Sequence, residues 1–137
     1  MRVYLKSLFQ KKKKPERPVG EIAGHHFTLG RNCCESVLLA HCRDADPAII
    51  EMAKAFGGGV GGSKCLCGAI TGGVMALSLH GHRTDAAKLV ELFKGRNKVT
   101  CCKVLSAPYV WKSKEHLANC RRLTSEVAED VEELLKK

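Results

Sequence analysis

The residues of this chain best suited to chemistry are its eight cysteines, an unusual number among 137 residues. Six of them follow closely on Asn32, Ser63 or Thr100, residue types that start helices. These six are Cys33, Cys34, Cys65, Cys67, Cys101 and Cys102. At the start of a helix, free amide N–H groups and the positive end of the helix dipole favour a thiolate over a thiol. The placement therefore predicts sulfurs that react or bind a metal, with Cys42 and Cys120 as further candidates.

The alternative for each cysteine is a small hydrophobic side chain in the core, where free cysteine is often found. The three groups at helix starts favour chemistry for the set as a whole. No pair has the C-x-x-C spacing of zinc ribbons or ferredoxins, and the lack of C-x-x-C-H excludes a covalently attached c-type haem. Neighbouring residues on a helix point about 100° apart, so one member of each adjacent pair is expected to face the core.

The chain shows no pattern of export or membrane insertion. Met1 to Gln10 is interrupted by Lys6 and lacks a small-residue cleavage site, so no signal peptide is predicted. The longest apolar stretch, Leu66 to Leu79, is shorter than the roughly 20 residues that a membrane helix needs. We therefore expect a cytoplasmic protein with no transmembrane segment and with reduced thiols. In that compartment cysteines more often bind metals or react than form structural disulfides.

Capping signals divide most of the chain into helices, and no segment alternates as a strand would. Asn32 and Glu35 form a capping box, and Asp46-Pro47 starts a second helix that stops at the glycine-rich loop 56–63. The predicted helices span about 33–42, 47–56, 65–80, 85–95, 101–105 and 115–136. The pattern predicts an all-α fold, a compact bundle of five to six helices with the glycine-rich loop before the central helix.

Residues 1–31 are expected to form a basic arm ahead of a helical cysteine-rich domain at 32–137, because Pro15, Pro18 and Gly20 oppose regular structure. The first 18 residues hold seven Lys or Arg and one acid, within a formal net charge of +9. The lysine run 11–14 has no interleaved aromatics, and aromatic residues are only 5% overall, which argues against a nucleic-acid partner. Peripheral contact of the arm with an acidic partner or an anionic membrane surface is the better expectation.

Several motifs resemble the C-GCAxxG-C-C family of redox-active proteins. The glycine-rich loop and the run Cys67-Gly-Ala-Ile-Thr-Gly72 look like the family's glycine loop and CGAxxG motif. Asn32-Cys33-x-x-x-Val37-Leu38 looks like its first motif, and Cys101-x-x-Val104-Leu105 like its third. The resemblance covers roughly residues 30–135. Carried over residue by residue, the family cysteines are Cys33, Cys67, Cys101 and Cys120, and the motif glycines Gly68 and Gly72 become candidate cofactor-binding positions.

The resemblance implies redox work on a helical scaffold related to the split-Soret cytochromes, which are homodimers that carry haem and an iron–sulfur centre. Haem-attachment motifs are missing here, so the resemblance implies an iron–sulfur cluster, a homodimer and a redox partner protein, but no haem. Four further cysteines depart from the simple pattern and are candidates for ligating a second or larger cluster. They are Cys34, Cys42, Cys65 and Cys102.

Three functions fit these observations. The first is an iron–sulfur protein for electron transfer or redox sensing, with thiolates from several helices as ligands. The second is a thiol–disulfide protein that cycles a cysteine pair. The third is a carrier of zinc or another metal without redox chemistry, with His80 and His82 as extra candidate ligands. The sequence leaves open whether a reaction is catalysed and which cysteine of each adjacent pair is a ligand.

Overall fold

The structure is a computed structural model, and it describes residues 17–137. Within that range it contains helices and no strand, which confirms the all-α prediction. The α-helices are α2 (Val19–Thr28), α3 (Cys33–His41), α4 (Pro47–Lys54), α5 (Gly68–Leu79), α6 (Ala86–Asn97), α7 (Cys102–Ser106) and α8 (Lys114–Leu135). Short 3₁₀ turns at Val60–Gly62 and Arg83–Asp85 precede α5 and α6. No helix in the described range is long and apolar enough to cross a membrane.

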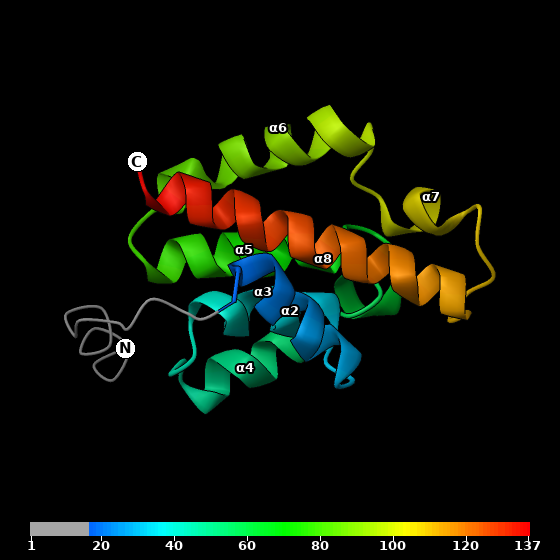
Figure 1. The fold of residues 1–137 in the computed structure, drawn as a ribbon, viewed down its shortest axis with the longest axis horizontal. Helices are drawn as coiled ribbons and strands as arrows, with labels where there is room; N and C mark the ends of the chain where they lie inside the picture. Colours follow the sequence, from blue (N-terminus) through cyan, green and yellow to red (C-terminus); the bar gives the residue numbers. More distant parts are fainter. Residues whose placement is uncertain (1–16) are drawn as a thin grey trace.

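The long helix α8 runs the length of the molecule and contacts α2, α3, α5 and α6 (Figure 1). Its inner face carries the buried residues Leu123, Val127, Val131 and Leu134, as its apolar stripe predicts. Leu117 is the exception, since 44% of it is exposed.

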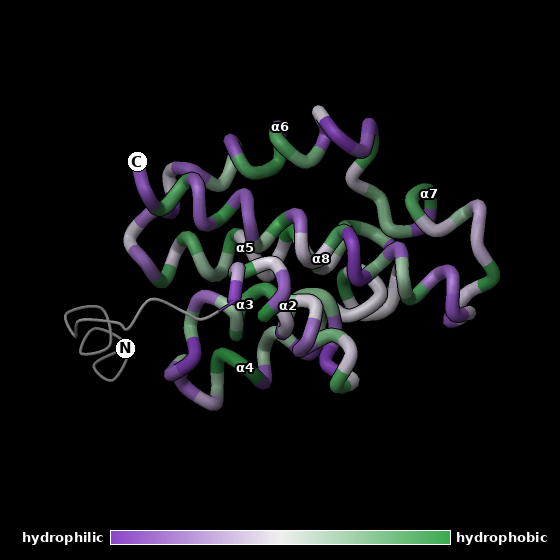
Figure 2. The backbone as a smooth tube through the Cα atoms, viewed as in Figure 1, coloured by the Kyte–Doolittle hydropathy of each residue, from purple (hydrophilic) through white to green (hydrophobic). Residues whose placement is uncertain are grey.

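Helix α5 is central and is packed between α3 on one side and α6 and α8 on the other. It has no charged residue, and Figure 2 contrasts it with α8, along which hydrophilic and hydrophobic residues alternate. Two adjacent glycines allow its close approach to both neighbours. A Cβ at Gly72 would lie 2.4 Å from the backbone oxygen of Cys34, and a Cβ at Gly73 would lie 2.5 Å from Leu89.

The expectation that the chain lacks regular structure up to residue 31 is wrong for α2. Pro18 occupies the N-cap position of this helix, where a missing N–H costs nothing. Gly20 lets the helix approach α8, and its N–H donates to Glu129 Oε1 at 2.9 Å. Val19 and Ala23 form a second small core with Ala128. Pro18 thus starts the helix, and Gly20 allows it to pack against α8. The lysine run of the predicted arm lies outside the described residues.

The helix-capping predictions at α3 and α4 are confirmed. Asn32 Oδ1 accepts a hydrogen bond from Glu35 N at 2.8 Å, and Glu35 Oε1 accepts one from Asn32 N at 3.2 Å. Asp46 caps α4 by accepting from Ala48 N at 2.8 Å. The amide of Asn32 also donates to the carbonyl of Ala53 at 3.3 Å, at the end of α4. This side chain therefore fixes the start of α3 against α4, directly before Cys33.

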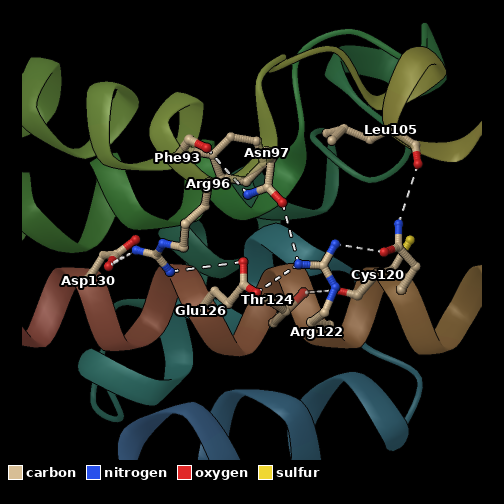
Figure 3. A network of polar contacts seen from close by, with 10 residues as sticks. Phe93, Arg96, Asn97, Leu105, Cys120, Arg122, Thr124, Glu126 and Asp130 are labelled. Carbon is tan, nitrogen blue, oxygen red and sulfur yellow. Dashed lines mark hydrogen bonds and ion pairs between the residues drawn. The ribbon is translucent and has the colours of Figure 1, made fainter.

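A polar network joins α6 to α8 (Figure 3). Arg96 donates to Asp130 Oδ1 and lies 3.9 Å from Glu126 Oε2, and Arg122 donates to Glu126 Oε1 at 2.7 Å. Asp130 is only 9% exposed. Burial raises the pKa of Asp130, and the Arg96 guanidinium opposes that shift.

We expect Arg96→Met to destabilise the fold by about 1–3 kcal/mol, because a buried carboxylate loses its partner. Without Arg96 the folded-state pKa of Asp130 rises further, so the folded protein takes up a proton more readily than the unfolded chain. The deficit should therefore shrink as the pH falls through the carboxyl range. Urea denaturation at several pH values measures the difference in the free energy of unfolding between the variant and the unaltered chain. Adding Asp130→Asn to the variant should recover stability at neutral pH. A deficit that grows toward low pH would contradict this explanation.

Candidate redox site

Four thiols from four segments of the chain line one cavity of about 130 Å³. They come from the start of α3, the residue before α5, the start of α7 and the first half of α8. They are Cys33, Cys67, Cys102 and Cys120. The remaining wall includes apolar side chains such as Phe27, Leu105 and Leu123 and the backbone of the glycine-rich loop. The fold thus brings sulfurs that are distant in sequence to one site.

Three of these cysteines stand at helix starts, as the sequence predicts. Cys33 and Cys102 are the first residues of α3 and α7, and Cys67 is the N-cap residue of α5. A backbone hydrogen bond from Cys67 N to the Thr100 carbonyl, 2.9 Å long, holds the start of α5 beside the start of α7. Because of this bond, residues 67 and 102 reach the same cavity from segments far apart in the chain.

Cys33 and Cys120 both line the cavity, and each thiol shifts the pKa of the other. A hydrogen bond from the Cys120 thiol lowers the pKa of Cys33, although burial acts in the opposite direction. The same contact raises the pKa of Cys120, and burial raises it further. The pair therefore shares a proton, with the negative charge favoured on Cys33 at the start of α3.

The other two cavity thiols are held neutral by their surroundings. Burial raises the pKa of Cys67 to about 12, with the nearby charge of Cys33 adding to the shift and the amides of Ala69 and Ile70 opposing it. Burial also raises the pKa of Cys102, and its thiol lies 4.0 Å from the Ser106 hydroxyl. One thiolate is therefore favoured in this cavity, and a positively charged group would be needed to hold more.

His116 is a polar residue of this site that the sequence reasoning missed. Its Nδ1 accepts a hydrogen bond from Lys112 N at 2.9 Å, so the neutral ring carries its proton on Nε2. That Nε2 lies 2.9 Å from Ser106 Oγ and 3.5 Å from Cys120 Sγ. Burial lowers the pKa of His116, which favours the neutral donor. The sequence did contain one signal for this residue. His116 precedes Cys120 by four residues on the same predicted helix, and this spacing places the two side chains on one face.

Trp111 closes one side of the cavity. Its ring centroid lies 4.4 Å from that of His116, and the Lys64 ammonium lies 4.4 Å from the centroid of the Trp111 ring. Lys64 adds positive charge that lowers the pKa of His116. The indole therefore contacts both His116 and the Lys64 ammonium. Trp111 is 36% exposed.

The remaining cysteines lie away from the cavity. Cys34 is fully buried, with its thiol 3.6 Å from Met75 Sδ, and burial raises its pKa to about 12. Cys42 is buried at the end of α3. Cys65 is exposed beside Cys101, whose thiol donates to the Lys64 carbonyl at 3.3 Å. Cys102 therefore lines the cavity and Cys101 does not, whereas the family motifs pointed to Cys101 as the third cysteine of the site.

The two motif glycines have different positions. Gly68 lines the cavity, and a Cβ there would lie 2.6 Å from the Phe56 carbonyl oxygen. Gly72 instead packs against the backbone of Cys34, where it lets α5 approach α3. Gly68 therefore remains a candidate for contact with a bound group, whereas Gly72 has a packing role.

The four thiols surround a volume instead of meeting at a point. Among residues 17–137, no group of three or more histidine, cysteine, aspartate or glutamate side chains is arranged to hold a metal ion. Zinc requires four ligands within about 2.3 Å of one centre.

Fold and site together define an all-helical protein with a thiol-lined cavity. The chain belongs to the family described as "Putative redox-active protein (C_GCAxxG_C_C)", which it matches over residues 31–134. This match confirms the resemblance based on the cysteine and glycine motifs. Comparisons with curated proteins and with solved structures find no match. The family identifies a redox-active cysteine protein without specifying its cofactor.

Proposed function

We propose that the protein binds an iron–sulfur cluster in the cavity through Cys33, Cys67, Cys102 and Cys120, and that it serves in electron transfer or redox sensing. The observation that carries this proposal is the approach of four thiols from four segments to one largely apolar cavity. Cysteine thiolates are the usual protein ligands of such clusters. Bound there, a cluster would supply reversible one-electron chemistry.

The residues around the thiols support this role. The starts of α3 and α5 place backbone N–H groups near Cys33 and Cys67, where they stabilise negative sulfur. His116 offers an N–H toward Cys120. Much of the wall is apolar and Cys67 is buried, and the exposure of a cluster to water is one determinant of its potential.

Anaerobic purification followed by iron and acid-labile sulfide analysis tests the proposal. We expect a brown protein with both elements and a paramagnetic signal after one-electron reduction. A colourless protein that takes up neither element after reconstitution would contradict the proposal, and so would stoichiometric zinc with no iron.

A second candidate is a dithiol function of Cys33 and Cys120, favoured because both thiols line the cavity and the Cys120 thiol lowers the pKa of Cys33. Their oxidation to a disulfide would give two electrons and two protons to an incoming disulfide, which leaves as two thiols. Iodoacetamide trapping under reducing and oxidising conditions separates the two candidates. A cluster protein should lose the reversible oxidation of this pair once iron and sulfide are bound.

We further expect His116→Phe to lower the reduction potential of the cluster. The histidine N–H stabilises the more negative, reduced form, and one such hydrogen bond contributes about 1 kcal/mol. That energy corresponds to a shift on the order of 40 mV for a one-electron couple. Redox titration followed by paramagnetic resonance measures the shift. The variant Leu117→Ala, which changes the wall without removing a donor, is the control and should move the potential less.

The homodimer, the redox partner protein and the cytoplasmic location also belong to this proposal. A protein that passes electrons needs a partner, and the resemblance implies the dimer. Analytical ultracentrifugation of the full chain tests the dimer directly.

A further inference from the structure

Two cysteines outside the cavity form a separate pair at the surface. Cys65 is exposed and Cys101 is half-buried, and the Cys101 thiol lies 3.3 Å from the carbonyl oxygen of Lys64, the residue before Cys65. Each of the two thiols shifts the pKa of the other. Neither lines the cavity. All other cysteines are buried or half-buried, so Cys65 is the most accessible thiol of the described chain.

Hydrogen bonds hold the segments that carry the two cysteines side by side. The Lys64 carbonyl accepts hydrogen bonds from Lys103 N at 2.8 Å and from the Cys101 thiol at 3.3 Å. Three residues after Lys64, Cys67 N donates to the Thr100 carbonyl. These bonds join segment 64–67 to segment 100–103, so the two cysteines meet as a consequence of the fold.

The peptide of Cys65 is fixed from the other side by the glycine-rich loop. Its carbonyl accepts from Val60 N at 2.8 Å and from the Ser63 hydroxyl at 2.9 Å. Gly59 has φ +83°, and a Cβ there would lie 2.3 Å from Cys65 N, so only glycine allows this packing. The loop therefore presents Cys65 to solvent in a defined position instead of burying it.

We propose that Cys65 and Cys101 are a second redox site, a surface dithiol that is oxidised reversibly to a disulfide by exchange with small-molecule disulfides. The site is distinct from the cavity thiols and does not depend on what the cavity binds. A disulfide here would join covalently the two segments that carry Cys67 and Cys102.

The reaction is balanced by the incoming disulfide. A thiolate of the pair attacks one of its sulfurs, forming a mixed disulfide and releasing one thiolate. The second cysteine loses its proton and attacks the protein-bound sulfur, which forms the Cys65–Cys101 bond and releases the second thiolate. The protein dithiol is oxidised by two electrons, and the reagent is reduced to two thiols that carry the two protons.

Oxidised glutathione is a suitable probe. The reduced full-length protein is treated with an excess of it, quenched with acid, alkylated with iodoacetamide, digested and mapped by mass spectrometry. We expect a crosslinked peptide that joins Cys65 to Cys101 and that disappears after treatment with dithiothreitol. Cys65→Ser and Cys101→Ser should each abolish the crosslink and leave glutathione attached to the remaining cysteine.

The matched control is Cys34→Ala, which removes a buried thiol and should leave the crosslink unchanged. Circular dichroism establishes that each variant is folded. Alkylation of both Cys65 and Cys101 after oxidation, with no crosslink between them, would overturn the proposal. Glutathione attached to Cys65 in the unaltered chain, with no second step, would also overturn it. Neither result depends on iron content, so the outcome is independent of the cluster proposal.

Discussion

Serine in place of Cys33 or Cys120 is expected to abolish the redox centre. Each side chain supplies one of the four sulfurs that line the cavity. Serine keeps the size of the side chain but binds iron poorly, because clusters are held by thiolates. Loss of a direct ligand should exceed the ~10–100-fold fall in metal affinity that follows loss of an outer-shell partner. Iron, sulfide and visible absorption after anaerobic reconstitution measure the effect.

The adjacent residue provides a control for this experiment. Cys34→Ala removes a thiol from the same turn of α3, but this thiol faces Met75 and not the cavity. The variant should lose some stability, since it leaves a small void in the core, and should keep its iron. Equal loss of iron in the Cys33 and Cys34 variants would mean that iron is lost because helix α3 is disturbed, and not because a ligand is removed.

Gly72→Ala is expected to destabilise the fold by about 3 kcal/mol, at the upper end of the usual cost of overpacking. The added Cβ would lie 2.4 Å from the Cys34 carbonyl oxygen, which belongs to the backbone and cannot rotate away. Helices α3 and α5 would have to move apart, and with them the two cavity thiols at their starts. Thermal and urea denaturation followed by circular dichroism measure the loss.

Gly95→Ala is the matched control for this substitution. Gly95 also lies within a helix, α6, but a Cβ there meets nothing within 4 Å. This variant should be more stable than the unaltered chain by about 0.5–1 kcal/mol, because alanine favours helix. Equal destabilisation by both substitutions would contradict the close approach of α5 to α3.

Local signals made much of the fold predictable. The Asn32 capping box and the Asp46-Pro47 start act within a few residues, so the sequence alone identifies them. Helix α2 was missed because its stability depends on contact with α8, about a hundred residues away in the chain. Pro18 opposes a helix interior but suits a helix start, and only tertiary packing separates the two outcomes.

In the candidate site, too, local features could be predicted from the sequence and features set by tertiary packing could not. Clustering of cysteines at helix starts is visible in the sequence, yet the choice between Cys101 and Cys102 depends on how α7 is rotated. The hydrogen bond from Cys67 N to the Thr100 carbonyl sets the segment before α7 beside the start of α5, and it joins segments that no short pattern relates. His116 escaped notice because a histidine near a cysteine on a long helix has no distinctive motif.

The most direct test of the central claim is an anomalous-scattering map, recorded at the iron edge from an anaerobic crystal of the reconstituted protein. The claim predicts iron inside the cavity, bound by the sulfurs of Cys33, Cys67, Cys102 and Cys120, with Cys101 left outside. A cavity without iron, or iron bound to a different set of cysteines, would contradict it.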